Sequence, residues 1–246
     1  TGPWGEAITG GYALLPDGTA VVEMAAAAGL PLVGEHRDPE GTTTYGVGQL
    51  MAHALAHGAS RLVLGLGGSA TNDGGCGAAA ALGAVFLDGQ NRPFVPVGST
   101  LKDIRHICTE GLRETLGAVP VEVMCDIDNP LCGPNGAAAV FGPQKGADAA
   151  MVRRLDAGLR QLAQVLADDL GAEVLTLSGG GAAGGFGAGA AALFGGTLRM
   201  GIDVVLDTVA FERQCQGASL VITGEGRLDS QSLRGKAVIG VARRAR

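Results

Sequence analysis

The sequence is poor in charged and aromatic side chains. Charged residues make up 17% of its 246 residues and aromatic residues only 4%, whereas hydrophobic residues reach 46%. A chain of this length and hydrophobicity can bury a sizeable core, which excludes intrinsic disorder. The shortage of aromatic rings argues against a β-sandwich core and against a platform on which nucleic-acid bases would stack.

Positive charge and paired cysteines are also scarce. The net charge is −6, and lysine occurs only three times. No basic patch is rich enough to neutralise a phosphate backbone, so we expect no binding to nucleic acid. The five cysteines include no C-x-x-C pair, which indicates reduced cytosolic thiols and no thiolate zinc site.

Long hydrophobic runs of the kind that cross membranes are missing. No residue between Glu173 and Arg199 is charged, but glycine and alanine dominate that stretch. Its insertion into a membrane would therefore gain too little free energy from buried apolar surface. Residues 1–30 lack the charged segment and apolar run of a signal peptide. We therefore expect a cytoplasmic protein with no membrane partner.

Glycine, by contrast, is abundant, and apolar runs end in glycine-rich turns. Four such runs predict buried strands, at residues 61–66, 121–126, 174–177 and 220–223. Helical spacing of apolar residues predicts helices around residues 47–55 and 152–166, the second capped by Gly171. Alternating strands and helices predict an α/β fold, whose ligands bind at the carboxyl ends of the strands.

The first candidate site is the loop that follows the strand at residues 61–66. Six glycines lie between Gly65 and Gly77, and they would let backbone N–H groups approach an anion. A tight turn at Asn-Asp-Gly is the alternative, although a turn needs only one or two glycines. The loop carries neither a P-loop G-x-x-x-x-G-K-[ST] nor a G-x-S-x-G nucleophile motif.

The second candidate site follows the strand at residues 121–126. Asp126 and Asp128 would point the same way on an extended chain, and such a pair suits Mg²⁺ held mainly through water and substrate phosphates. An Asx turn before Pro130 explains the same residues equally well. Lys145, in the turn Gly-Pro-Gln-Lys-Gly, would face either a phosphate or solvent.

Two further glycine-rich loops lie nearer the C-terminus. Gly179, Gly181 and Gly184 match the dinucleotide fingerprint G-x-G-x-x-G, and Asp203 follows at a suitable distance. In a chain this rich in glycine, a turn feeding a closely packed helix is the simpler interpretation. The loop at residues 223–231 brings a carboxylate, a guanidinium and a second carboxylate together, which suits either ligand binding or internal ion pairs.

Taken together, these stretches resemble the glycerate kinase family of the type that makes 2-phosphoglycerate. The resemblance rests on residues 67–75, 125–131, 136–147, 222–229 and 235–242. Segments that usually begin family members, an Asp-Ser-Phe-Lys-Gly-Ser-type stretch and a Gly-Gly-Glu-Gly loop, are absent. The chain also starts at Thr1 and stops inside a predicted helix, so we expect a piece of a longer protein.

The resemblance implies a kinase that moves the γ-phosphoryl group of ATP to the 2-hydroxyl of D-glycerate, with Mg²⁺ as its metal. It implies two α/β domains, one inserted into the other. Residues 1–206 would be mainly an inserted restriction-endonuclease-like domain, and residues 207–246 the start of the returning part of a split flavodoxin-like domain. The oligomeric state stays open, and a homo-oligomer is compatible with the sequence.

The resemblance also groups the candidate residues into a set, within which individual roles are hypotheses. The candidate catalytic residues are Asp73, Glu225, Arg227 and Asp229. The candidate cofactor-binding residues are Gly67, Gly68, Ser69, Thr71, Asn72, Lys145 and Lys236. The candidate metal ligands are Asp126 and Asp128. Such a set can neutralise phosphate charge and accept a hydroxyl proton, as phosphoryl transfer requires.

Two other functions are compatible with the sequence. A nicotinamide-dependent oxidoreductase would use the fingerprint glycines together with Asp203. A non-catalytic ligand-binding fragment would keep the glycine loops without turnover.

Overall fold

A computed structural model describes residues 1–226 and 237–245 of the chain. Within these residues, one sheet has five strands in the order β1-β2-β3-β7-β8, and a smaller sheet has the order β5-β4-β6. The strands of the large sheet are β1 (Ala13–Leu14), β2 (Thr19–Glu23), β3 (Arg61–Gly65), β7 (Val121–Met124) and β8 (Thr197–Arg199). From β2 to β8 all neighbours are parallel, whereas β1 pairs antiparallel with β2 at the edge.

The smaller sheet is antiparallel and consists of β4 (Val85–Leu87), β5 (Pro93–Phe94) and β6 (His106–Cys108). The helices before β7 are α1 (Ala25–Ala28), α2 (Leu30–Val33), α3 (Tyr45–Ala56), α4 (Cys76–Ala81), the 3-10 helix η1 (Gly98–Asp103) and α5 (Glu110–Leu116). Those after β7 are α6 (Ala137–Phe141), the 3-10 helix η2 (Pro143–Lys145), α7 (Ala149–Leu170), α8 (Ala182–Phe194), α9 (Gly201–Thr208), α10 (Phe211–Gln214) and α11 (Ala237–Arg244). This arrangement confirms the predicted α/β class.

The predicted helices and the first two predicted strands are confirmed. Leu155, Leu159, Leu162 and Leu166 of α7 are buried, as their spacing requires. Gly171 ends this helix in the left-handed conformation, with φ 66°. The central strands β3 and β7 are apolar because helices α3 and α8 pack against the sheet that contains them.

Two predicted strands are wrong. Residues 174–177 form turns, and the neighbour of β7 is instead β8, whose three residues are too few to produce a recognisable apolar run. Residues 220–223 lie in an irregular segment that has no strand partner in the part of the chain described. Leu220 and Ile222 are consequently 74% and 87% exposed. An apolar pattern predicts a strand only where a neighbouring strand accepts its hydrogen bonds.

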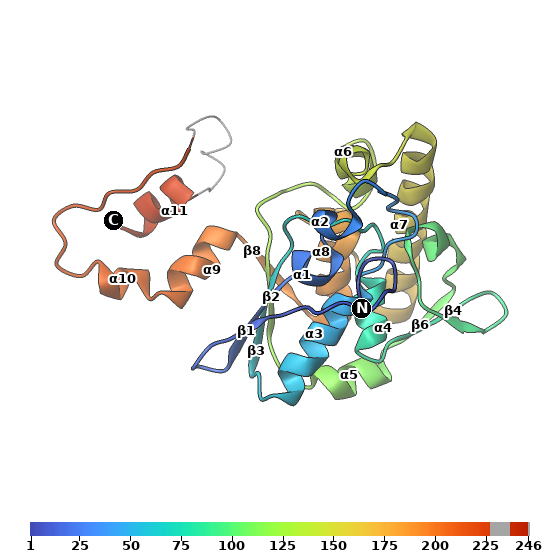
Figure 1. Ribbon diagram of the computed structural model, residues 1–246, viewed down its shortest axis with the longest axis horizontal. Helices are drawn as coiled ribbons and strands as arrows, with labels where there is room; N and C mark the ends of the chain where they lie inside the picture. The colour runs from blue at the N-terminus through green and yellow to red at the C-terminus, as the bar shows by residue number, and fades with distance from the viewer. Residues whose placement is uncertain (227–236, 246) are drawn as a thin grey trace.

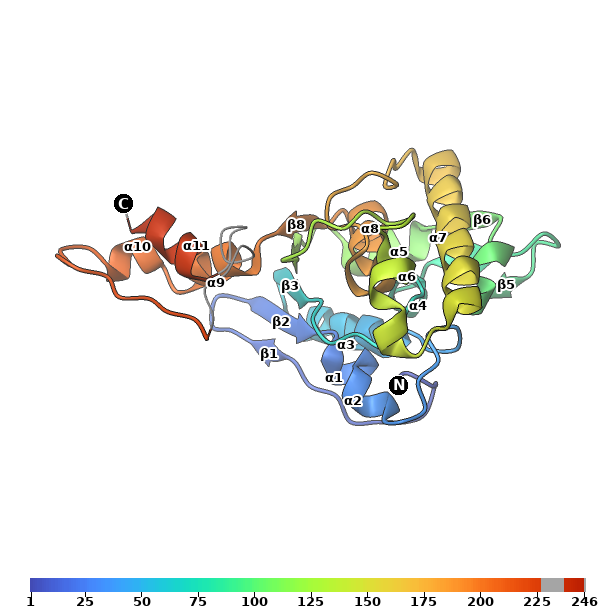
Figure 2. The ribbon, with the colours of Figure 1, turned by 90° about the horizontal axis from the view of Figure 1, so that it is seen from above.

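The described residues after Met200 form an extension that we call the C-terminal arm (residues 201–226 and 237–245). Figures 1 and 2 show α9, α10 and α11 projecting away from the rest of the chain. The arm starts at Gly201, a few residues before the domain boundary that the sequence predicts after residue 206, and the identity of the two domains stays a prediction. No helix in the described ranges has the length and apolarity needed to cross a membrane.

An arginine junction connects the arm to the large sheet. Arg199 in β8 donates to Glu122 of β7 at 3.1 Å and to Asp207 of α9 at 2.6 Å. Arg244 of α11 donates to the other oxygen of Asp207, also at 2.6 Å. Hydrogen bonds from both arginines hold the pKa of Asp207 below its usual value.

Several helices approach other segments so closely that only glycine fits. A Cβ atom at Gly189 in α8 would overlap the carbonyl oxygen of Gly74, and one at Gly48 in α3 would overlap the backbone of Ala78 in α4. The first contact brings α8 against the loop that follows β3, and the second brings α3 against α4. The glycine content therefore reflects packing as well as turns.

We predict that Gly189→Ala destabilises the protein by up to about 2 kcal/mol. The added methyl group overlaps backbone that cannot rotate away, which costs roughly 1–3 kcal/mol, and the preference of a helix interior for alanine offsets about 1 kcal/mol of that loss. Urea denaturation measures the difference. The control is Gly89→Ala at an exposed site with nothing within 4 Å. An unchanged midpoint for Gly189→Ala would contradict the packing described here.

Candidate functional site

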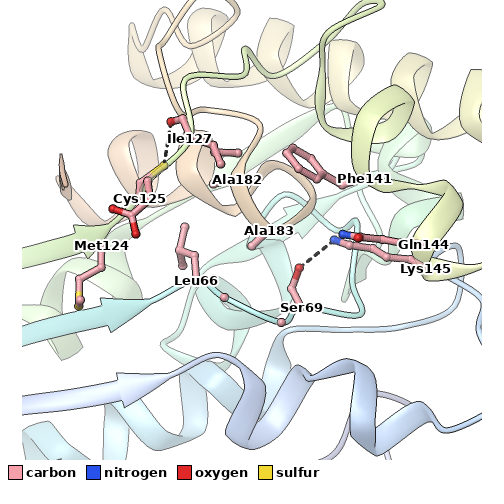
Figure 3. A pocket seen from close by; sticks show the side chains of 13 residues that line it. Leu66, Ser69, Met124, Cys125, Ile127, Phe141, Gln144, Lys145, Ala182 and Ala183 are labelled. Atoms are coloured by element: carbon pink, nitrogen blue, oxygen red, sulfur yellow. Dashed lines mark hydrogen bonds between the residues drawn. The ribbon is translucent and has the colours of Figure 1, made fainter. Parts of the chain in front are cut away.

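A pocket of about 250 Å³ lies where β3 and β7 end. Because these strands are parallel neighbours, the loops that follow them meet at one edge of the sheet. We call this cavity the central pocket (Figure 3). Its lining residues come from four segments and are Leu66, Gly67, Gly68, Ser69, Met124, Cys125, Asp126, Ile127, Phe141, Gln144, Lys145, Ala182 and Ala183.

Lys145 is the cation of the central pocket. Its side chain comes from η2 and is only 2% exposed. Nζ donates to Ser69 Oγ at 2.8 Å and to the carbonyl oxygen of Thr71 at 2.7 Å, so the lysine points towards the glycine loop (Figure 3). Burial lowers the pKa of Lys145 to about 7, while the negative charge of Asp73 acts in the opposite direction.

Asp73 lies beneath the loop, fully buried, and is not among the residues lining the central pocket. Its carboxylate accepts hydrogen bonds from the backbone N–H and hydroxyl of Thr44 at 2.7 and 2.8 Å. It also accepts from the N–H groups of Gly75 and Gly77 at 3.1 and 3.3 Å. Burial raises the pKa of Asp73 above its usual value even though these bonds favour the carboxylate. The proton-accepting role of Asp73 stays a prediction.

Thr71 and Asn72 are buried in the same loop, 0% and 1% exposed. The Thr71 hydroxyl and both polar atoms of the Asn72 amide find no hydrogen-bond partner among the residues described. The backbone of both residues lies against Gly184, whose carbonyl oxygen accepts from Gly74 N–H at 3.1 Å. Buried polar groups of this kind usually gain a partner from water or a ligand.

The first turn of α8 is strained beside this loop. Ala183, Gly184 and Gly185 all have left-handed backbone, with φ of 52°, 67° and 90°. Left-handed backbone is costly for alanine, and such strain concentrates at functional sites. The arrangement also corrects the dinucleotide fingerprint: residues 174–177 form turns, so the glycines do not follow a strand as that motif requires.

Asp126 and Asp128 follow β7 and are both exposed. Oδ1 of Asp126 accepts from the N–H of Gly201 at 2.7 Å, at the first residue of α9. No group of three or more His, Cys, Asp or Glu residues in the described ranges is arranged to hold a metal ion. Mg²⁺, however, is usually held by one or two carboxylates together with water and phosphate oxygens. Asp126, which lines the pocket, fits that role, and Asp128 follows two residues later without lining the pocket.

The remaining candidates lie in or near the last glycine loop. Glu225 is partly buried and is not among the lining residues of the central pocket. Arg227, Asp229 and Lys236 lie outside the described residues, so their roles stay predictions.

A family model described as the glycerate kinase family matches residues 1–246. This chain belongs to the glycerate kinase family. It is 49% identical over 248 residues to glycerate kinase of Bacillus subtilis strain 168, covering 100% of this chain and 65% of that protein. It is 46% identical over 244 residues to glycerate 2-kinase of Escherichia coli K12, covering 98% of this chain and 64% of that protein.

A solved structure agrees with this family assignment. The crystal structure of a Salmonella typhimurium LT2 protein assigned as glycerate kinase 2 matches with a TM-score of 0.93 and 48% sequence identity. The match covers 100% of this chain and 66% of that one. The chain thus spans about two thirds of the length of the family members that it matches.

The apolar half of the central pocket carries no sequence motif. Phe141, Ala182 and Ala183 line it, but alanine and phenylalanine carry no chemistry that would mark them in a sequence. The strained backbone at Ala183 is invisible as well, because alanine normally prefers a right-handed helix. Only the glycines around it indicated an unusual turn.

We predict that the Lys145 amine makes stability rise with pH. The folded protein holds this amine at a pKa of about 7, against an ordinary value of 10.5. Between these values the unfolded chain binds more protons, so the free energy of unfolding increases with pH. Relative to Lys145→Met, the free energy of unfolding of the wild type should increase by up to about 1.4 kcal/mol for each pH unit above neutrality.

Urea denaturation at several pH values between about 7 and 9 measures this difference. Lys102→Met is the matched control, because Lys102 is exposed and pairs only with the neighbouring Asp103 among the described residues. A constant difference between the wild type and Lys145→Met would show that Lys145 does not titrate in this range.

Proposed function

We propose that the protein is a glycerate 2-kinase, which transfers the γ-phosphoryl group of ATP to the 2-hydroxyl of D-glycerate and releases ADP. The match to the Escherichia coli protein named glycerate 2-kinase supports the choice of hydroxyl. Membership of a kinase family supports the use of ATP. Because the chain spans about 65% of its relatives, the proposal concerns the protein of which it forms a part.

The observation that carries the proposal is the buried Lys145 beside the glycine loop. Phosphoryl transfer depends on positioning and on neutralising charge more than on a strong nucleophile. Gly67, Gly68 and Ser69 line the same pocket as Lys145, so backbone N–H groups, a hydroxyl and an ammonium can converge on anionic ligands there. The unpartnered side chains of Thr71 and Asn72 add polar groups next to this wall.

Asp126 and Asp128 would hold Mg²⁺ at the edge of the pocket. The bound ion would supply positive charge to the phosphate oxygens of the nucleotide. Asp126 has one oxygen bonded to Gly201 N–H, which fixes the orientation of the carboxylate. Glu225, Arg227, Asp229 and Lys236 would complete the site from the loop at residues 223–236. The hydroxyl proton would pass to Asp73, Glu225 or Asp229.

We extend the proposal to the organisation of the protein. Residues 1–206 would form mainly the inserted domain and residues 207–246 the start of the returning flavodoxin-like segment, as the projecting arm suggests. A cytoplasmic location suits a kinase that uses ATP. The nicotinamide alternative has lost its support, because its glycine motif does not follow a strand.

A coupled assay tests the reaction and the position of the phosphoryl group. The chain with its native flanking sequence and the 246-residue chain each receive MgATP and D-glycerate, and enolase acts on the product without a mutase. We expect a signal with the flanked chain, because enolase uses 2-phosphoglycerate directly and does not use the 3-isomer.

The 246-residue chain serves to test the fragment alternative. Binding without turnover by the short chain, next to turnover by the flanked one, would identify it as a ligand-binding part of the enzyme. ATP consumption by the flanked chain without an enolase signal would contradict transfer to the 2-hydroxyl. No ATP consumption at all would contradict the kinase proposal.

A further inference from the structure

The lining of the central pocket contains a buried cation, Lys145, and an exposed carboxylate, Asp126. Lys145 is only 2% exposed, whereas Asp126 is exposed. Figure 3 shows Cys125, the neighbour of Asp126 in sequence, across the pocket from Lys145, with Ala183 between them. A ligand in the pocket can therefore meet the lysine with one group and the aspartate with another.

The Lys145 ammonium has one N–H donor left for a ligand. An ammonium carries three donors, and two of them bond to Ser69 Oγ and to the carbonyl oxygen of Thr71. Both of these acceptors are uncharged. Asp73, the acid whose charge acts on Lys145, directs its oxygens to Thr44, Gly75 and Gly77. The positive charge thus lacks a direct anionic partner within the described part of the chain.

We propose that Lys145 binds the carboxylate of the acid that the enzyme phosphorylates, and that it makes the site select hydroxy acids over uncharged polyols. The inference rests on the proposed function, and it gives Lys145 a different ligand from the nucleotide phosphate that the sequence suggested. A carboxylate fits because its single negative charge balances the positive charge of the ammonium. One of its oxygens can also accept a hydrogen bond from the remaining N–H donor of Lys145.

The size of the pocket favours the acid over the nucleotide. Pockets that enclose drug-sized ligands measure about 300–1,000 Å³, whereas the central pocket measures about 250 Å³. A three-carbon acid fits such a space as a whole, whereas a nucleoside triphosphate would extend beyond it. No arginine in the described residues lines the pocket to help Lys145 neutralise a multiply charged phosphate.

The walls between the two charged ends suit the rest of such an acid. Leu66, Phe141 and Ala182 are apolar, and they lower the local polarity around the lysine, which strengthens its pairing with a carboxylate. Asp126 also lines the pocket and can accept hydrogen bonds from hydroxyl groups. An acid held by its carboxylate at Lys145 would thus present its hydroxyls towards Asp126.

Steady-state kinetics on the chain with its native flanking sequence test this inference. We expect Lys145→Met and Lys145→Gln to raise the KM for D-glycerate about 10- to 100-fold, the usual loss for a buried hydrogen bond to a charged group. The KM for ATP should change by less than about threefold. The exposed Lys102→Met serves as the control and should match the wild type. A KM for ATP that rises as much as the KM for D-glycerate, or a KM for D-glycerate that stays constant, overturns the inference.

Calorimetry separates this inference from the proposed function. If the wild type shows no turnover, the kinase proposal fails, and binding of D-glycerate and of glycerol is measured directly on wild type, Lys145→Met and Lys145→Gln. Binding of the acid but not of glycerol by the wild type, and loss of that binding in both variants, supports the inference. Equal binding of the acid by wild type and variants, or no binding of it by the wild type, overturns it. Circular dichroism confirms that each variant is folded.

Discussion

The buried carboxylate of Asp73 fixes the geometry on which the rest of the site depends. It joins Thr44 at the start of α3 to Gly75 and Gly77 at the start of α4, and the Thr44 hydroxyl in turn accepts from Ala78 N–H at 2.9 Å. One anion therefore holds two helices and the glycine loop in a single arrangement. Removing a partner from a buried charge is costly, so this arrangement has little freedom to vary.

The loop shaped in this way brings together groups that are distant in sequence. Ser69 and Thr71 reach Lys145, which lies 76 and 74 positions later, because α6 and η2 return the chain to the carboxyl ends of β3 and β7. The left-handed turn at residues 183–185 covers the loop from α8. The site thus combines an anchored loop, a buried cation and a strained helix start, which depend on one another for their positions.

The sequence predicted the parts of this structure that follow from repetition. Leucines at helical spacing marked α7, and continuous apolar runs marked β3 and β7. The sequence does not predict the elements that tertiary contacts determine. Residues 174–177 have the composition of a strand, but the position beside β7 is occupied by the three residues of β8. From the sequence alone, Lys145 could face either a phosphate or solvent. The burial of its side chain depends on contacts with Ser69 and Thr71, which lie more than seventy residues away. The nearby alanines and Phe141 gave no chemical signal.

The hydrogen bond from Gly201 to Asp126 links the pocket wall to the C-terminal arm. Asp126 lines the central pocket, and Gly201 is the first residue of the helix that the arginine junction ties to the sheet. The orientation of this carboxylate in the pocket is therefore tied to the point at which the arm begins.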